Sequence, residues 1–265
     1  MPDRLPFCLL LAALWLTGCQ QGIPAIPVVG QTPAAPACDE PGRVLSAQVD
    51  DTARGYPYYY RVYLPPCYDT DAGRLYPVLY LIPGRSGGPG NWFAAGVDKA
   101  ADELILGGQI PPLIIVTTES IDADGYAESI FNDLLPAIES RYPIQADRAH
   151  RAVAGGSLGG IGAYRLAFRH PGHFGSAGIF GSGLVSGEEE QARQWLVAIP
   201  PPDRPRVFLN CGQEDVLMLD RAQAMIVLLD EMGIASTSIF SQGEHTYAYW
   251  VSNFPAYLRW LAQEW

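Results

Sequence analysis

Residues 153–160 read VAGGSLGG, a G-x-S-x-G pattern with Ser157 at its centre and further glycines at positions 156 and 160. Such a pattern forms a sharp, strained turn between a strand and a helix, where only small residues fit two positions before and after the serine. Apolar residues precede it, and a helix-like segment, 161–170, follows it. The pattern predicts either an exposed, nucleophilic Ser157 or a glycine-rich turn without chemistry.

Short apolar runs alternate with helix-like segments along the rest of the chain. The first two expected strands alternate in polarity and form an antiparallel pair, whereas the later ones are continuously apolar, as in strands buried on both faces. We predict an α/β fold with a mainly parallel central sheet, an antiparallel N-terminal pair and helices on both faces. The expected strands are 44–49, 58–64, 77–82, 113–117, 151–155, 174–180, 206–211 and 235–240. The expected helices are 97–106, 130–142, 161–170, 188–197, 217–232 and 247–265.

The first 37 residues predict a leader and a tether. The apolar run 9–16 is too short to span a bilayer but suits the core of a signal peptide. It ends in LTGC at 16–19, which resembles a bacterial lipobox with Cys19 as the lipidated residue; the alternative is an ordinary secretory signal. Residues 20–37 are uncharged and rich in Pro, Ala, Gly and Gln, as in an extended tether. We predict a signal peptide at 1–18, a tether at 19–37 and one catalytic domain at 38–265, lipid-anchored in a bacterial cell envelope and facing the extracytoplasmic side.

The charge of the chain limits its expected partners, and its cysteines indicate which disulfides are expected. The formal net charge of −11 argues against nucleic acid as a partner and against a polybasic membrane face. Export permits disulfides, and a bond between Cys38 and Cys67 would join the start of the domain to its sheet, although pairing cannot be deduced from spacing. Cys211 lies in an apolar strand, which favours a buried free thiol.

A serine nucleophile requires a base and an acid that orients the base. Of the four histidines, His150 precedes its strand, and His170 and His173 lie at the far end of the helix that follows Ser157. His245 follows the last strand, at the strand end where sites of such sheets lie, and is the expected base. The chain order Ser, Asp or Glu, His then favours Asp215 as the acid, with Glu214 as the alternative. Either carboxylate would also suit the cap of the next helix.

Stabilisation of an oxyanion needs two backbone N–H groups. The first is expected from Leu158, the residue after the nucleophile. The second is expected from Arg85, in the glycine-rich loop 82–88 after an early buried strand; a flexible surface loop is the alternative. The segment 120–125 lacks the third oxygen and the distal glutamate of a calcium loop, and we expect it to line the substrate cleft instead. We expect no metal and no cofactor, because zinc spacing, phosphate-loop and dinucleotide patterns are absent from the sequence.

Five motifs occur in the order typical of the putative-esterase family of α/β-hydrolases, which the chain resembles from residue 44 to 265. The family includes feruloyl and acetyl xylan esterases, siderophore esterases, S-formylglutathione hydrolases and mycolyltransferases. The resemblance implies an α/β-hydrolase fold, the triad Ser157, Asp215 and His245, and oxyanion donors at Arg85 and Leu158. Many relatives have His-Gly where this chain has Pro83-Gly84. The motifs are YLIPG (80–84), GGSLGG (155–160), FRHPGHF (168–174), CGQED (211–215) and GEHTYAYW (243–250).

The expected activity is hydrolysis of an extracytoplasmic carboxylic ester through an acyl-enzyme. The alternatives are acyl transfer of the mycolyltransferase type and a surface-binding lipoprotein on an inactive hydrolase scaffold. Trp92, Tyr126 and Trp250 stand near strand ends, where they would either contact a phenolic or sugar ester or pack in the core. The substrate is thus a small or polysaccharide-linked ester that the sequence leaves unnamed.

Overall fold

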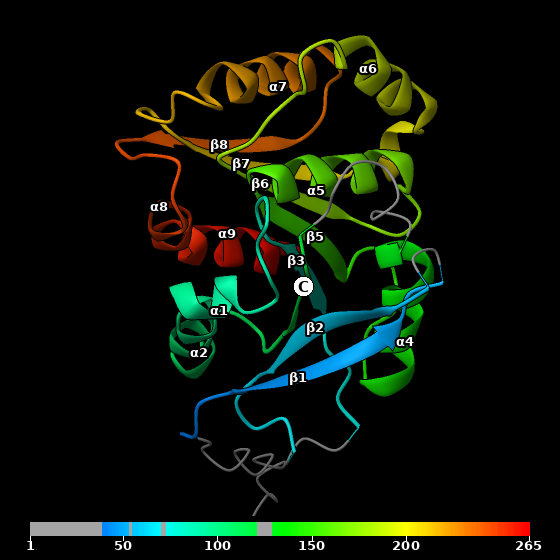
Figure 1. Cartoon of the computed structure of the whole chain (residues 1–265), viewed down its shortest axis with the longest axis vertical. Coiled ribbons are helices and arrows are strands. Elements are labelled where there is room, and N and C mark those ends of the chain that lie inside the picture. The colour runs from blue at the N-terminus through cyan, green and yellow to red at the C-terminus, as the bar shows by residue number, and fades with distance from the viewer. Residues whose placement is uncertain (1–38, 53–54, 70–72, 121–128) are drawn as a thin grey trace, which may run out of the picture. The chain divides into compact units, whose positions relative to one another are not determined.

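The computed structural model describes residues 39–52, 55–69, 73–120 and 129–265. The predicted leader, tether, Cys19, Cys38 and Tyr126, and the proposed cleft segment beyond Ser120, lie outside the described residues. In the described part, the strands form one sheet in the order β1-β2-β4-β3-β5-β6-β7-β8 (Figure 1). The strands are β1 Arg43–Asp50, β2 Pro57–Leu64, β3 Val78–Ile82, β4 Ile114–Thr117, β5 Arg151–Gly156, β6 Ser176–Phe180, β7 Arg206–Gly212 and β8 Ser236–Ser241.

The pairing of the strands confirms the predicted topology. β1 pairs antiparallel with β2, and β2 pairs antiparallel with β4. The neighbours from β4 to β8 are all parallel. The carboxyl ends of these parallel strands therefore meet along one edge of the sheet, where ligands bind in open α/β folds.

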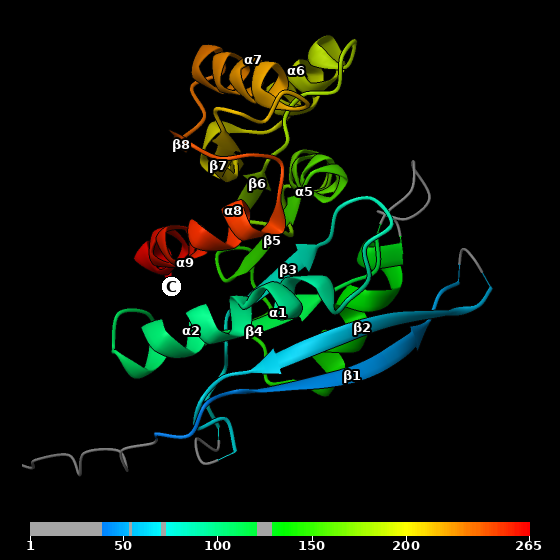
Figure 2. The ribbon, with the colours of Figure 1, turned by 60° about the vertical axis from the view of Figure 1, so that its left-hand side comes forward.

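Helices cover both faces of this sheet (Figures 1 and 2). The continuously apolar strands place hydrophobic side chains on both faces of the sheet, because successive side chains point to opposite sides. In β3, Tyr80 packs in one core layer and the adjacent Leu79 and Leu81 in the other. The first layer contains residues of η1 Ile130–Leu134, α4 Leu135–Arg141, α5 Leu158–Arg169, α6 Glu189–Ala198 and α7 Leu219–Glu231. The second contains residues of α1 Asn91–Ala95, α2 Val97–Leu106, α8 Tyr247–Ser252 and α9 Phe254–Leu261.

Several helix boundaries differ from the prediction. The helix expected over 247–265 is divided at Asn253 into α8 and α9, followed by the 3₁₀ turn η3 Ala262–Glu264. Pro255 lies in the first turn of α9 and cannot donate a hydrogen bond to the preceding turn, which explains the break. The helix expected from residue 130 begins as the π-helical turn η1, and Pro136 is accommodated in the first turn of α4. The short α1 was not predicted, and η2 Pro201–Asp203 precedes β7.

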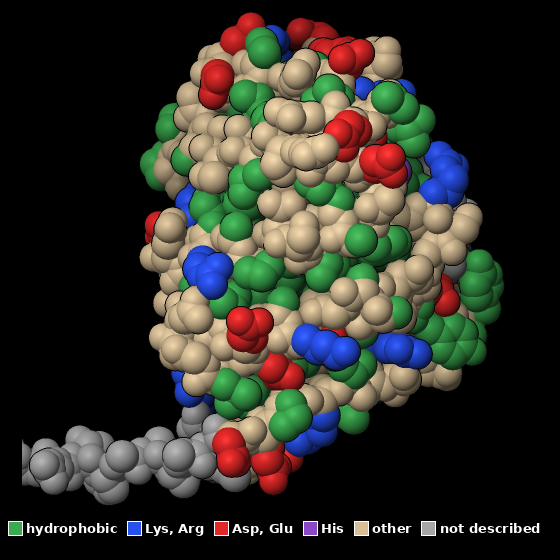
Figure 3. All heavy atoms as spheres, turned by 90° about the vertical axis from the view of Figure 1, so that its left-hand side faces the viewer, with side chains coloured by type: hydrophobic (Ala, Val, Ile, Leu, Met, Phe, Trp, Pro, Cys, Tyr) green, Lys and Arg blue, Asp and Glu red, His purple; other side chains and the backbone are tan. Residues whose placement is uncertain are grey.

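Figure 3 shows the side of the described unit on which α8, α1 and α2 lie in Figure 1. Hydrophobic side chains are spread among carboxylates and basic side chains, and neither sign of charge forms a continuous field on this face. The excess of acidic side chains is therefore not concentrated on this face.

The predicted strand-to-helix turn joins β5 to α5. Ser157 lies between them with φ 55° and ψ −120°, a strained conformation for a residue with a side chain. Glycine is required at positions 156 and 159, because a side chain there would collide with neighbouring atoms. A Cβ on Gly159 would lie 2.5 Å from the Pro83 carbonyl oxygen and closer still to that of Ile82. A Cβ on Gly156 would lie 2.5 Å from the Trp250 ring.

We expect Gly159→Ala to lower the free energy of unfolding by about 1–3 kcal/mol, because the added methyl meets backbone atoms that cannot rotate away. Gly172→Ala is the matched control, since a Cβ there meets nothing within 4 Å. Denaturant unfolding of both variants measures the difference. Equal stability of the two variants would show that the turn is less crowded than the structure indicates.

Candidate active site

Three predicted residues converge at the carboxyl edge of the sheet. Ser157 follows β5, Asp215 follows β7 and His245 follows β8. The Oγ of Ser157 lies 2.9 Å from Nε2 of His245, and Nδ1 of His245 lies 2.7 Å from Oδ2 of Asp215. With its proton on Nδ1, the imidazole donates to the carboxylate and accepts from the serine hydroxyl. This is the geometry in which a serine, a base and an orienting acid act together.

Asp215 both orients His245 and holds the turn that precedes α7. Its side chain is completely buried, and its Oδ1 accepts the backbone N–H groups of Leu217 and Met218 at 3.2 and 3.1 Å. These bonds explain why α7 begins two residues later than predicted. Glu214, the alternative acid, is exposed and has no contact with His245 in the described structure.

The thiol of Cys211 lies next to the acid. Its Sγ is 3.8 Å from Oδ2 of Asp215, and the side chain is fully buried and free, as the sequence predicts. Burial, followed by the charge of Asp215 and the hydrogen bond to it, raises the pKa of Cys211 to about 12. The thiol therefore donates to the carboxylate and does not ionise.

The other histidines lie away from Ser157. The ring of His170 stacks on Phe131 with centroids 4.1 Å apart, and His173 meets the same ring edge-on at 4.6 Å. Nδ1 of His150 lies 2.8 Å from Asp147. Burial and the nearby Arg151 lower the pKa of His173. The elimination that led to His245 thus agrees with the arrangement of all four rings.

Two backbone N–H groups near Ser157 have no acceptor in the described part of the chain. One belongs to Leu158, the first residue of α5, and the other to Arg85 in the loop after β3. The N–H of Gly84 is occupied, since it donates to the hydroxyl of Tyr247 at 3.0 Å. The turn at Pro83-Gly84 is closed by a hydrogen bond from the Gly87 N–H to the Gly84 carbonyl at 2.9 Å. The two predicted oxyanion donors are therefore unoccupied, and Tyr247 holds the loop that carries Arg85.

A cavity of about 270 Å³ opens beside the serine. Its walls come from the loop after β3, the start of α5, the start of α7 and the loop after β8. Sequence reasoning missed the contribution of α7, because no local pattern marks these positions. The lining residues are Arg85, Ser157, Leu158, Ile161, Leu217, Met218, Arg221 and His245.

Two of the three aromatic residues expected near the site, Trp92 and Trp250, belong to the core. Trp92 and Trp250 are buried, and their rings pack with centroids 5.9 Å apart. Nε1 of Trp92 donates to the Ile82 carbonyl at 3.1 Å. Trp250 supports the base, because the His245 ring meets it edge-on at 5.1 Å. The suggestion that these two rings contact substrate is therefore wrong.

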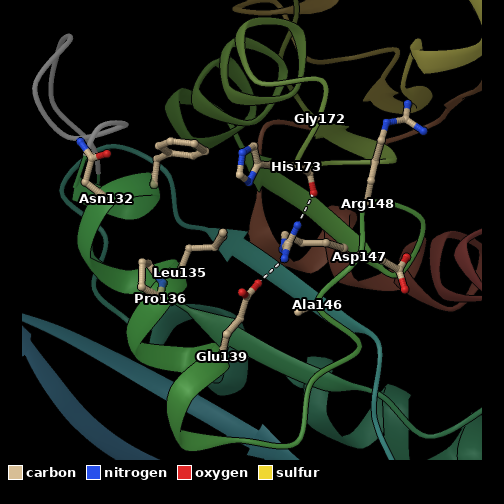
Figure 4. Close-up of a pocket in the computed structure, with 11 residues that line it drawn as sticks. Asn132, Leu135, Pro136, Glu139, Ala146, Asp147, Arg148, Gly172 and His173 are labelled. Atoms are coloured by element: carbon tan, nitrogen blue, oxygen red, sulfur yellow. Dashed lines mark hydrogen bonds and ion pairs between the residues drawn. The ribbon is translucent and has the colours of Figure 1, made fainter.

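A larger cavity of about 530 Å³ lies at the amino end of β5, away from Ser157. Figure 4 shows Glu139, Asp147, Arg148 and His173 around it. Arg151 forms an ion pair with Glu139 and donates to the His173 carbonyl at 2.8 Å. No serine or cysteine is among the described residues that line this cavity.

Cys67 is disulfide-bonded, whereas Cys211 is free. The partner of Cys67 therefore lies outside the described residues, and its pairing with Cys38 stays a prediction. Among the described residues, no group of three or more His, Cys, Asp or Glu side chains is arranged to hold a metal ion. Within the same ranges, no helix has the length and apolar character needed to cross a membrane.

Comparison with known proteins points to one family. Residues 53–261 match the family described as "Putative esterase". An endo-1,4-beta-xylanase/feruloyl esterase of Xylanibacter ruminicola is 28% identical over 153 residues, 53% of this chain and 20% of that protein. An esterase of Mycobacterium tuberculosis is 36% identical over 129 residues, 44% of this chain and 27% of that protein. The matches thus span only about a fifth to a quarter of these relatives.

Solved structures share the fold. A ferulic acid esterase superposes with a TM-score of 0.75 at 24% identity, covering 84% of this chain and 98% of its own. A likeness at this identity establishes the α/β-hydrolase fold, with its mainly parallel sheet, as predicted.

We expect Cys211 to resist alkylation in the folded protein, because a pKa of about 12 leaves on the order of one thiolate in 10⁴ at pH 8. Iodoacetamide treatment followed by peptide mass spectrometry should find Cys211 unmodified at pH 8 and modified after unfolding in guanidinium. Rapid modification of Cys211 without unfolding would contradict its burial beside Asp215.

Proposed function

The chain belongs to the putative esterase family, and on this premise we propose that it hydrolyses carboxylic esters with Ser157 as its nucleophile. The observation that carries the proposal is the continuous hydrogen-bonded series from Ser157 through His245 to Asp215. The esterase and feruloyl esterase relatives support the reaction class.

In the first half-reaction, Ser157 Oγ attacks the ester carbonyl carbon while its proton moves to Nε2 of His245. The imidazolium is stabilised by the Asp215 carboxylate, which stays ionised. The tetrahedral oxyanion accepts hydrogen bonds from the N–H groups of Leu158 and Arg85, which have no other acceptor within the described structure. Collapse of this intermediate breaks the bond to the alcohol oxygen, which takes the proton from His245.

In the second half-reaction, water replaces the alcohol. His245 removes a proton from the water as it attacks the acyl carbon, and the same N–H groups hold the second oxyanion. Collapse returns the proton to Ser157 and releases the acid. Tyr247 acts as a positioning residue, since its hydroxyl fixes Gly84 and thereby the adjacent Arg85 N–H.

We also propose that the enzyme works on the extracytoplasmic side of a bacterial envelope, tethered by lipid on Cys19. The lipobox-like LTGC at 16–19 and the uncharged segment that follows support this location. The disulfide-bonded Cys67 agrees with an oxidising compartment. The substrate would then be an ester outside the cytoplasm.

Expression of the full chain and its Cys19→Ala variant in a bacterium tests the anchor. The parent protein should partition with membranes and incorporate labelled palmitate, because acyl chains on Cys19 bind it stably to the bilayer. The variant should incorporate none. Membrane association and labelling of the variant equal to those of the parent chain would contradict the proposal.

Substitutions in the triad test the mechanism on p-nitrophenyl acetate. Ser157→Ala should lower kcat by a factor on the order of 10⁵–10⁶ and abolish labelling by a fluorophosphonate probe. Asp215→Asn should lower kcat by about 10⁴, because the N–H groups of Leu217 and Met218 would hold the amide oxygen and leave the NH2 to donate to Nδ1, which favours the wrong tautomer of His245. Glu214→Gln is the matched control and should leave kcat within about twofold.

Full activity in Ser157→Ala would overturn the nucleophile assignment. A larger loss in Glu214→Gln than in Asp215→Asn would transfer the acid role to Glu214. Product analysis with an added alcohol distinguishes hydrolysis from acyl transfer, since transfer yields a new ester in place of the free acid.

A further inference from the structure

Two arginines face the cavity beside Ser157 without a partner. Arg85 is exposed in the loop after β3, and Arg221 is half-buried in the first turns of α7. In the described part of the chain, neither guanidinium makes a hydrogen bond or an ion pair. The described residues that line the cavity include no Asp or Glu, so within the described structure no carboxylate neutralises these two charges.

Several arginines elsewhere in the structure are paired with carboxylates. Arg43 binds Asp69, Arg165 binds Glu188 at 2.9 Å, and Arg193 binds Glu231 at 2.6 Å, although Arg193 lies on the surface. The chain has 28 acidic and 17 basic residues, so carboxylates are plentiful partners. Two unpaired arginines that line one small cavity therefore create a local positive field on an acidic protein.

The remaining walls of the cavity are apolar. Leu158 and Ile161 come from α5, and Leu217 and Met218 from the turn before α7. Leu217 is 63% exposed and its neighbour Val216 93% exposed, so apolar side chains reach solvent where the turn before α7 borders the cavity. A ligand that fills this space would contact hydrocarbon and guanidinium groups together.

We propose that the substrate is a carboxylic ester that carries a second, anionic group on an apolar body, and that Arg85 and Arg221 bind this group. The inference rests on the proposed ester hydrolysis and specifies its substrate class. A guanidinium pairs with a carboxylate through two parallel N–H···O bonds, which orients the ligand as well as attracting it. The apolar walls bind the body of the same molecule while the ester carbonyl meets Ser157.

Matched pairs of esters that differ by one charge test this specificity. On the leaving-group side the pair is 4-acetoxybenzoate and 4-acetoxybenzamide; on the acyl side it is the monophenyl ester of adipic acid and phenyl hexanoate. The measured quantity is the ratio of kcat/KM for the anionic ester to kcat/KM for the neutral ester. A ratio cancels any change in the chemical step or in the fraction of folded enzyme.

Arg221→Gln should lower this ratio by about fivefold in at least one pair, as expected for loss of a partly exposed ion pair. Arg221→Lys should recover part of the ratio because it keeps the charge, and Arg85→Gln should lower the ratio in the same pair. The pair that responds identifies whether the anion belongs to the acyl or the alcohol part. Arg259→Gln on α9, where Arg259 binds Gln109, removes one positive charge elsewhere and is the control.

Raising NaCl from about 20 to about 500 mM should reduce the wild-type ratio in the responding pair. Ratios in Arg221→Gln and Arg85→Gln equal to that of Arg259→Gln in both pairs would overturn the inference, while Ser157-dependent cleavage of the neutral esters would leave the proposed function standing. Absence of cleavage of all four esters by the wild-type enzyme would instead refute the proposed function.

Discussion

The backbone packs so closely around Ser157 that the neighbouring glycine positions have no room for a larger residue. The turn from β5 to α5 lies directly against the carbonyl oxygens of Ile82 and Pro83 at the end of β3, and Gly159 is the residue that makes this contact possible. Ser157 in turn adopts a positive φ, and its N–H donates to the Phe180 carbonyl of β6 at 2.9 Å. The serine is thus held by both neighbouring strands, and its hydroxyl is directed to the strand end.

The same contact positions the groups that serve the serine. Because α5 begins immediately after Ser157, the Leu158 N–H is left without an intrahelical acceptor and faces the site. Because the loop after β3 lies against the turn, the Arg85 N–H comes from the opposite side. Arg85 also contributes its side chain to the cavity, so one short loop supplies both a backbone donor and a charge.

Local patterns were sufficient for the strands, since each parallel strand is a short apolar run buried on both faces. They were less reliable for helix boundaries. A capping role was expected for Asp215 or Glu214, but the pattern did not show that Asp215 accepts two backbone N–H groups in the turn before α7, so that the helix begins only at Leu219. The aromatic residues near the strand ends were ambiguous, because Trp92 and Trp250 pack against each other only once α1 and α8 meet on one face.

The sequence by itself determined the strand-to-helix turn, the order of serine, acid and base, and the parallel sheet that brings them to one edge. Each of these follows from local constraints: glycine where a Cβ would collide, and apolar runs where both faces are buried. Tertiary structure alone decided which carboxylate reaches His245, that Tyr247 holds Gly84, and that Arg221 and Arg85 line the same cavity. These contacts join residues far apart in the chain, so they depend on how α7 and α8 pack against the sheet, which no local pattern encodes.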